Sequence, residues 1–262
     1  MTVAAEDKLP LGWWGRTLKC LRIGILYIAG ISLMTVGSLV TLIVAILTLF
    51  QFRRFYAEVM IGAMAKIGLW MAGVRFVVHQ ASSFPDCQAV YISNHASTLD
   101  IFILTALRLP NARFFLSGSL RRRIPPLGLL GYIARVFWTV PQAFPERRVE
   151  IFKRAERVLR RTGESVYLSP EGIIGETGSI SPFNKGAFHL ATNLHAPIVP
   201  IFIDIPREID PGWGYDFRPG VVDVHILPAI STEHWTVEQL DENRTTTHGD
   251  YVELQKRFQG QP

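Results

Sequence analysis

The sequence has few cysteines and few charged side chains for its length. Two cysteines among 262 residues, Cys20 and Cys87, exclude a disulfide scaffold and a four-thiolate zinc site. Charged residues make up 19% and hydrophobic residues 48% of the chain, the opposite of the balance in disordered proteins. The Gly-x-Ser-x-Gly elbow of serine hydrolases is also missing. The net charge of +5 favours an anionic partner, such as a membrane surface or a phosphorylated substrate.

The apolar residues are concentrated near the N-terminus. No charged residue occurs between Arg22 and Arg53, an interval of 30 residues. A membrane-spanning helix needs about 20 apolar residues, and the apolar part of a signal peptide is shorter. We therefore expect a tilted span or a re-entrant hairpin broken near residues 30–37. A buried core helix is the less favoured alternative, because so long an uncharged run exceeds what a small core hides.

A second apolar stretch covers residues 55–74 and contains Glu58 and Lys66. Its pattern predicts an amphipathic helix, which either lies at a membrane interface or packs in the globular core. We accordingly divide the chain into membrane-anchoring helices in residues 1–73 and a catalytic domain in residues 74–262. The expected protein is an integral or monotopic membrane protein with its catalytic domain on the cytoplasmic side.

After residue 74 the pattern changes to short apolar strands that alternate with helices, which indicates an α/β sheet with crossover connections. A polar segment, residues 241–250, reads as a loose connection to a short final helix. The expected strands are 74–79, 89–93, 113–116, 134–140, 165–169, 198–203 and 221–227, and the expected helices are 101–109, 146–161 and 185–193.

The helix expected at residues 146–161 is strongly basic. Its simplest interpretation is a solvated surface helix stabilised by pairs such as Glu150–Arg154 and Glu156–Arg160. Contact with anionic lipid headgroups is the functional alternative. Nucleic-acid binding is disfavoured, because no exposed aromatic residues are interleaved with the basic ones. The basic residues are Arg147, Arg148, Lys153, Arg154, Arg157, Arg160 and Arg161.

His95 and Asp100 are the candidate catalytic pair. They lie between an expected strand and an expected helix, in Asn-His-Ala-Ser-Thr-Leu-Asp, where α/β folds gather their active sites. A neutral imidazole accepts a proton near pH 7, and a carboxylate on its other nitrogen fixes the tautomer. The pair suits removal of a proton from an attacking hydroxyl. The alternatives are a purely structural helix start at Ser97 and Asp100, and a hydrolase with Ser97 as nucleophile.

A second cluster of polar residues follows the expected strand 165–169. The turn Pro170-Glu-Gly172 places the carboxylate of Glu171 at a strand end. Further along, Lys185 stands at an expected helix start, where a helix N-terminus already favours anions. The alternative is an ordinary turn followed by a surface lysine.

Four motifs occur in a fixed order, Asn94–Asp100, Pro170–Gly172, Pro182–Phe188 and Ile198–Ile201. In this order they resemble the glycerolipid acyltransferase family, which includes the 1-acylglycerol-3-phosphate acyltransferases. The resemblance implies an α/β fold, with a mixed sheet flanked by helices. It also implies transfer of an acyl chain from a thioester, acyl-CoA or acyl-carrier protein, to the hydroxyl of a lysophospholipid in phospholipid biosynthesis.

The resemblance also implies roles for particular residues. His95 is the base, Asp100 is its partner, and Glu171 and Gly172 line the acceptor site. We expect a lysolipid acceptor, an acyl thioester donor and a membrane as partners, and no nucleic acid, cofactor or metal ion. The remaining histidines do not pair with carboxylates or cysteines at the spacing of metal ligands.

The chain departs from the family at the residues that bind acceptor phosphate. The family's Glu-Gly-Thr-Arg motif becomes Glu-Gly-Ile-Ile here, so Ile174 replaces an arginine, and no arginine occurs in residues 138–141. Lys185 and the arginines at 121–123 are expected to rebuild a weaker site. The alternatives are an acceptor without a phosphomonoester, such as an amino-acid lipid or glycolipid, and a non-catalytic lipid-binding membrane protein. The rebuilt site would thus comprise Lys185, Arg121, Arg122 and Arg123.

Overall fold

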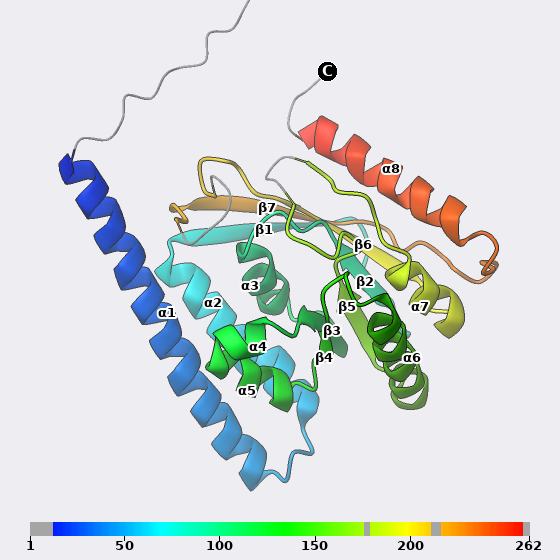
Figure 1. Ribbon diagram of the computed structural model, residues 1–262, viewed down its shortest axis with the longest axis horizontal. Helices are drawn as coiled ribbons and strands as arrows, with labels where there is room; N and C mark the ends of the chain where they lie inside the picture. Colours follow the sequence, from blue (N-terminus) through cyan, green and yellow to red (C-terminus); the bar gives the residue numbers. More distant parts are fainter. Residues whose placement is uncertain (1–12, 176–178, 211–215, 259–262) are drawn as a thin grey trace, which may run out of the picture.

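A computed structural model describes residues 13–175, 179–210 and 216–258, which form a seven-stranded sheet between two layers of helices (Figure 1). The strand order is β1-β7-β6-β2-β5-β3-β4. The strands are β1 (Val74–Gln80), β2 (Val90–Ser93), β3 (Ala112–Ser117), β4 (Phe137–Thr139), β5 (Ser165–Leu168), β6 (Ile198–Asp204) and β7 (Gly220–Ile226).

The sheet is mixed. Strands β6, β2, β5, β3 and β4 are parallel to one another, whereas β7 runs antiparallel to β6 and carries β1 alongside it in parallel. The two central strands β2 and β5 are buried along their whole length, as expected for parallel strands covered on both faces. The predicted mixed α/β sheet flanked by helices is therefore confirmed.

One helical layer consists of α2 (Gly62–Met71) and α3 (Leu99–Ala106), whose apolar residues join the core on one face of the sheet. The other layer consists of α6 (Pro145–Thr162), α7 (Gly186–Leu194) and α8 (Leu240–Phe258), which enclose a second core. Two short helices, α4 (Leu120–Arg123) and α5 (Pro125–Ile133), follow β3. Helix α5 begins at a proline pair, which favours the first turn of a helix, and it ends at Ile133. The strand expected at residues 134–140 is therefore shorter in the structure, where β4 begins at Phe137.

Helix α1 (Trp13–Leu47) is a single helix of 35 residues that lies along the edge of the molecule (Figure 1). It continues through Gly30 and Gly37, so the alternative of a hairpin broken there is wrong. The chain turns back only at residues 48–52, where Leu49 and Phe50 adopt the left-handed conformation. A side chain on Gly37 would overlap Met64, so this glycine lets α1 approach α2 closely.

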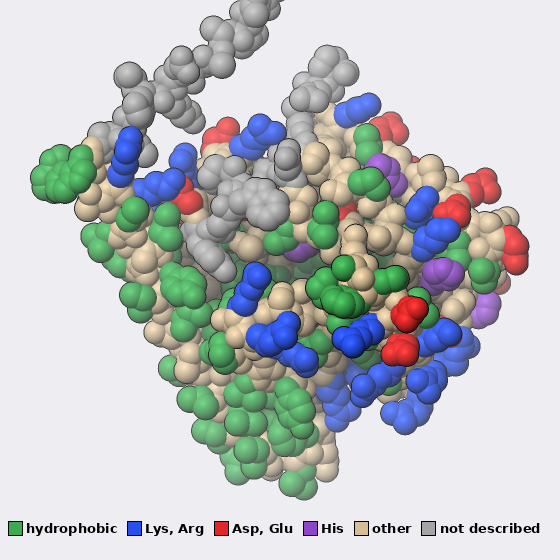
Figure 2. Space-filling view, viewed as in Figure 1, with side chains coloured by type: hydrophobic (Ala, Val, Ile, Leu, Met, Phe, Trp, Pro, Cys, Tyr) green, Lys and Arg blue, Asp and Glu red, His purple; other side chains and the backbone are tan. Residues whose placement is uncertain are grey.

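The segment after α1 begins as a π-helical stretch, η1 (Phe55–Ile61), and continues as α2. Met64, Ala65 and Leu69 are buried, whereas Trp70 is 77% exposed. One face thus packs on the globular core and the other carries apolar side chains to the surface, while contact of this stretch with a membrane interface stays a prediction. Figure 2 shows hydrophobic side chains covering the visible surface along α1. The division of the chain at residue 73 stays a prediction.

A buried group of three charged residues joins the N-terminal segment to the sheet. Arg53 and Arg113 both form ion pairs with Glu164, and all three are at most 8% exposed. Arg53 also donates to the side-chain oxygen of Asn111 at 2.7 Å. Burial alone would raise the pKa of Glu164, but the hydrogen bond from Arg113 and the charge of Arg53 outweigh it, so the pKa lies below its ordinary value.

Helix α8 corrects the expectation of a loose connection at residues 241–250. The helix begins at Leu240 and has 19 residues, with Asp241 and Glu242 in its first turn, where acidic groups favour the helix dipole. Tyr251 is fully buried and its hydroxyl lies 3.1 Å from the carbonyl oxygens of both Ile92 and Ile201, which can accept its one hydrogen. The polar sequence concealed this helix because few of its residues face the core.

Candidate active site

His95 lies in the loop between β2 and α3, and Asp100 lies in the first turn of α3. His95 Nδ1 is 2.9 Å from Asp100 Oδ2, and the same oxygen accepts the backbone N–H groups of Ala96 and Ser97, both at 3.0 Å. The Asp100 side chain is 2% exposed and the His95 ring 26% exposed. With Nδ1–H donating to the carboxylate, the other ring nitrogen, Nε2, is left to accept a proton from a substrate.

Hydrogen bonds of a helix start are present beside the candidate catalytic pair. Asp100 lies in the first turn of α3, and Ser97 Oγ accepts the N–H of Leu99 at 2.9 Å. Ser97 Oγ also donates to the buried carboxylate of Asp210. Its hydroxyl is therefore directed at Asp210 and not at the His95 ring, which argues against Ser97 as a nucleophile.

Glu171 fixes the backbone of His95 from the neighbouring strand. It follows β5, which pairs with β2, and its Oε1 accepts the N–H of His95 at 2.8 Å. Its Oε2 accepts the N–H of Ser181, also at 2.8 Å, and the residue is 2% exposed. Burial raises the pKa of Glu171, and the two N–H groups oppose that rise. The carboxylate is thus occupied by backbone groups and acts on the position of His95.

The turn after Glu171 requires glycine. Gly172 has a φ of +72°, in the left-handed region. A Cβ atom there would lie 2.8 Å from Asn184 Nδ2, 3.3 Å from Gln142 Nε2 and 3.8 Å from Arg148 Nη2. Asn184 Nδ2 is already bonded to the carbonyl oxygens of residues 170 and 171, at 3.0 and 2.8 Å. The space above Gly172 is therefore lined by nitrogen donors.

Arg148 also lies near the site. In the sequence it stands out only as one of the basic residues expected on the helix at 146–161. It lies in the first turn of α6, is half-buried, and donates from Nη1 to the carbonyl oxygen of Val140 at 3.1 Å. Burial lowers the pKa of its guanidinium. No spacing in the sequence distinguishes Arg148 from the other six basic residues of that helix. Only the packing of α6 beside the Glu171 turn does so.

The other predicted substrate-binding residues are more exposed. Lys185 Nζ lies 2.7 Å from Asp241 Oδ2 at the start of α8. The three arginines of α4 are exposed, and Arg121 lies over the Trp138 ring with its Cζ 6.0 Å from the centroid. Helix α4 follows the carboxyl end of β3, which is the edge of the sheet that carries His95. Figure 2 shows basic side chains over α4 and over α6.

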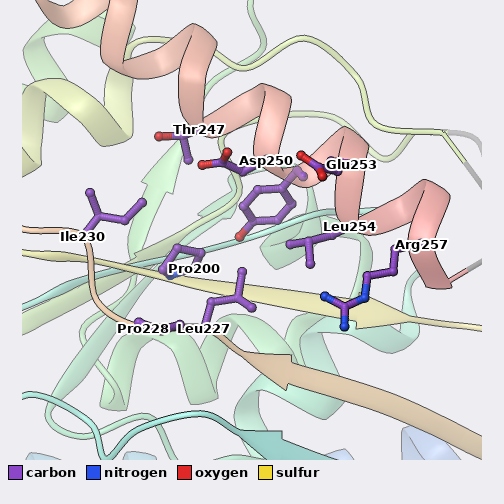
Figure 3. A pocket seen from close by; sticks show the side chains of 10 residues that line it. Pro200, Leu227, Pro228, Ile230, Thr247, Asp250, Glu253, Leu254 and Arg257 are labelled. Atoms are coloured by element: carbon purple, nitrogen blue, oxygen red, sulfur yellow. The ribbon is translucent and has the colours of Figure 1, made fainter.

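One cavity of the molecule lies apart from the His95 loop and the Glu171 turn. A cavity of about 330 Å³ lies between α8 and the ends of β6 and β7, lined in part by Asp250, Glu253 and Arg257 (Figure 3). None of its lining residues belongs to the His95 loop or the Glu171 turn. Within the described ranges of the chain, no group of three or more metal-ligating side chains is placed to hold a metal ion.

Comparisons with known proteins agree with this geometry. The Acyltransferase family model matches residues 75–204, which include the His95 loop and the Glu171 turn. The 1-acyl-sn-glycerol-3-phosphate acyltransferase of Limnanthes douglasii is 31% identical over 187 residues, 70% of this chain and 64% of that protein. The chain belongs to the glycerolipid acyltransferase family.

A human relative, 1-acyl-sn-glycerol-3-phosphate acyltransferase beta, is 29% identical over 177 residues, 67% of this chain and 63% of that protein. The matched region thus spans slightly less than two thirds of either relative. The crystal structure of a 1-acyl-sn-glycerophosphate acyltransferase from Thermotoga maritima shares the fold, with a TM-score of 0.78 and 19% identity. That match covers 94% of this chain and 98% of the other, so the shared fold extends well beyond the matched domain.

Proposed function

We propose that this chain is a membrane-bound O-acyltransferase that moves a fatty acyl chain from a thioester donor to the hydroxyl of 1-acylglycerol-3-phosphate, in phospholipid biosynthesis. The observation that carries the proposal is the half-exposed imidazole of His95, whose Nδ1 is fixed by the buried carboxylate of Asp100 at 2.9 Å. The names of the relatives supply the acceptor and the type of reaction.

The proposed reaction is a direct transfer. His95 Nε2 removes the proton of the acceptor hydroxyl as its oxygen attacks the thioester carbonyl. A C–O bond forms, the C–S bond breaks, and the proton on His95 passes to the departing thiolate. Asp100 stabilises the imidazolium that exists between the two proton transfers. The donor is acyl-CoA or acyl-carrier protein, and no covalent enzyme intermediate or cofactor is involved.

Membrane attachment is proposed through α1. The helix is long and apolar enough to cross a membrane, and only 17% of its most apolar stretch of 18 residues is buried inside the protein. Burial of such a surface in lipid is driven by the hydrophobic effect, which salt does not screen. We therefore expect the full-length chain to sediment with membranes after washing in 1 M salt; its release into the supernatant would contradict this part of the proposal. The catalytic domain is proposed to face the cytoplasm.

One observation favours a second candidate acceptor. Ile174 stands where the family carries an arginine, and an isoleucine cannot form the charge-assisted bidentate hydrogen bonds that bind phosphate. An amino-acid lipid or glycolipid without a phosphomonoester is therefore the alternative substrate. The non-catalytic alternative has no comparable support, because the His95–Asp100 pair is intact and hydrogen-bonded.

The test is acyl transfer from radiolabelled acyl-CoA by the purified full-length protein to a panel of lysolipids at equal concentration. The panel contains lysophosphatidic acid, lysophosphatidylcholine, monoacylglycerol and a lyso-amino-acid lipid. A strong preference for lysophosphatidic acid supports the proposal, and preference for an acceptor without a phosphomonoester favours the alternative. Absence of transfer to every acceptor, from acyl-CoA and from acyl-carrier protein, would exclude the proposed activity.

A further inference from the structure

The space above Gly172 is the least explained part of the site. Gly172 is exposed, and a Cβ atom there would come too close to Asn184 Nδ2, with Gln142 Nε2 and Arg148 Nη2 slightly farther away. Asn184 Nδ2 already donates both of its hydrogens to two backbone carbonyl oxygens. Gln142 and Arg148 therefore supply the donors that remain available at this point.

Arg148 has no acidic partner within the part of the chain that the structure describes. Among the described residues no carboxylate lies within ion-pair distance of its guanidinium, and the guanidinium donates from Nη1 to the carbonyl oxygen of Val140. The contrast with Arg53 and Arg113 is clear, because those two buried arginines share Glu164. Removing an arginine partly from water without a compensating anion costs free energy, which is why an anion from outside the chain suits this position.

The position is also close to the reacting groups. Arg148 Nη2 lies 3.8 Å from the Cβ position of Gly172, which is adjacent to Glu171, and Glu171 accepts the N–H of His95 at 2.8 Å. A phosphate above Gly172 would thus lie beside the turn that holds the backbone of His95. The helix that carries Arg148 and the turn that carries Gly172 are separate elements brought together by the sheet.

We propose that Arg148, assisted by Gln142, binds a phosphate group of the substrate above Gly172. The proposal rests on the acyltransferase function proposed above and assigns the anion contact to a residue outside the positions where the family carries its arginine. The phosphate belongs either to the acceptor, lysophosphatidic acid, or to the CoA portion of the donor. Both sources present the same chemistry, and an arginine recognises it through paired N–H donors.

The experiment compares Arg148→Gln with Arg148→Lys and with the wild type in steady-state acyl transfer. Arg147→Gln is the matched control, because Arg147 is exposed and its guanidinium stacks on the Phe144 ring. The acceptors are lysophosphatidic acid and monoacylglycerol with the same acyl chain. The donors are acyl-CoA and acyl-pantetheine, which lacks the phosphates.

We expect Arg148→Gln to raise the KM of one phosphate-bearing substrate about tenfold or more, with kcat changed less than threefold. Its phosphate-free counterpart should change less than twofold. Arg148→Lys should recover part of the loss, since lysine keeps the charge without the fork. A rise confined to lysophosphatidic acid assigns the phosphate to the acceptor, and a rise confined to acyl-CoA assigns it to the donor.

Two results would overturn the proposal. One is a KM within twofold of the wild type for both phosphate-bearing substrates, and the other is an equal rise for the phosphate-free counterparts, which would indicate a structural role. Equilibrium binding of lysophosphatidic acid and of CoA to the same variants, without turnover, keeps this test independent of the reaction. Wild-type binding that Arg148→Gln abolishes supports the anion site even where transfer is not observed.

Discussion

The predicted site residues form a buried group, here called the floor, and an exposed group, here called the rim. The two groups hold their polar side chains in different ways. On the floor, His95, Asp100 and Glu171 are bonded to one another or to backbone N–H groups, and both carboxylates are about 2% exposed. On the rim, Lys185 is paired with a surface aspartate and the arginines of α4 are exposed. Buried polar groups must be satisfied in one geometry, whereas exposed ones exchange partners with water.

The difference teaches where function is sensitive to substitution. A buried acceptor that loses its donor retains the full cost of desolvation, so substitutions on the floor should have large effects. A solvated ion pair contributes little, so substitutions on the rim should matter only where a side chain contacts substrate. Arg148 is intermediate, because it is half-buried but has no carboxylate partner in the described part of the chain.

The largest effect is expected at His95. His95→Ala removes the proposed general base and should lower kcat about 10²- to 10⁴-fold, measured by acyl transfer at saturating substrate. Asp100→Asn should also be severe, because it disturbs the tautomer of His95 and the two N–H contacts of the loop. The exposed His234→Ala is the control. Retention of most activity by a folded His95→Ala protein would contradict the mechanism.

Glu164 tests whether a buried charge away from the catalytic loop is as sensitive to substitution as the residues of the floor. Glu164→Gln leaves Arg53 and Arg113 without a buried carboxylate and should lower the free energy of unfolding by about 3 kcal/mol. The folded-state pKa of Glu164 is lowered, so this stabilisation is present above about pH 5. It is lost as the pH falls through the folded-state pKa.

Denaturant unfolding in detergent at pH 7 and at more acidic pH measures this difference. Glu156→Gln is the control, because the Glu156 carboxylate is partly exposed, its pair with Arg160 should contribute about 0.5 kcal/mol or less, and glutamine can still accept the hydrogen bond from Asn193. A stability difference for Glu164→Gln that is constant with pH would show that the arginines find other partners.

Glu171→Gln sharpens the comparison on the floor itself. The amide keeps one acceptor oxygen but turns an NH₂ group toward the N–H of His95 or of Ser181. The loss of one such contact costs about 1–3 kcal/mol, so kcat should fall about tenfold or more while the protein remains folded. The exposed Glu208→Gln is the matched control. Unchanged kinetics would mean that the position of His95 does not depend on this carboxylate.

The smallest effect is expected on the rim. Lys185→Ala removes an exposed pair with Asp241, and it should leave the melting temperature nearly unchanged. Because Lys185 Nζ is engaged by α8, we expect the KM of lysophosphatidic acid to change less than about threefold. A much larger rise in KM would show that the lysine exchanges Asp241 for the substrate, as the binding site predicted from the sequence requires.

The sequence predicted most of the architecture because its signals are local. The run without charges between Arg22 and Arg53 predicted a long apolar helix, and short apolar runs marked the sheet strands. The polar composition of residues 241–250 misled, since helix α8 is stabilised by a few buried contacts such as those of Tyr251. Helix propensity is a weak signal where tertiary packing supplies the stability.

The sequence by itself determined the His95–Asp100 pair, because a spacing of five residues keeps both side chains close together where the loop after a strand enters a helix. Only the tertiary structure decided what surrounds that pair. The contact of Glu171 with the N–H of His95 joins residues 76 positions apart, and it exists because β5 lies beside β2 in the sheet. The approach of Arg148 to Gly172 likewise depends on how α6 packs on that sheet. Short spacings are fixed by covalent geometry, whereas such distant contacts follow from strand order and helix packing, which local patterns do not encode.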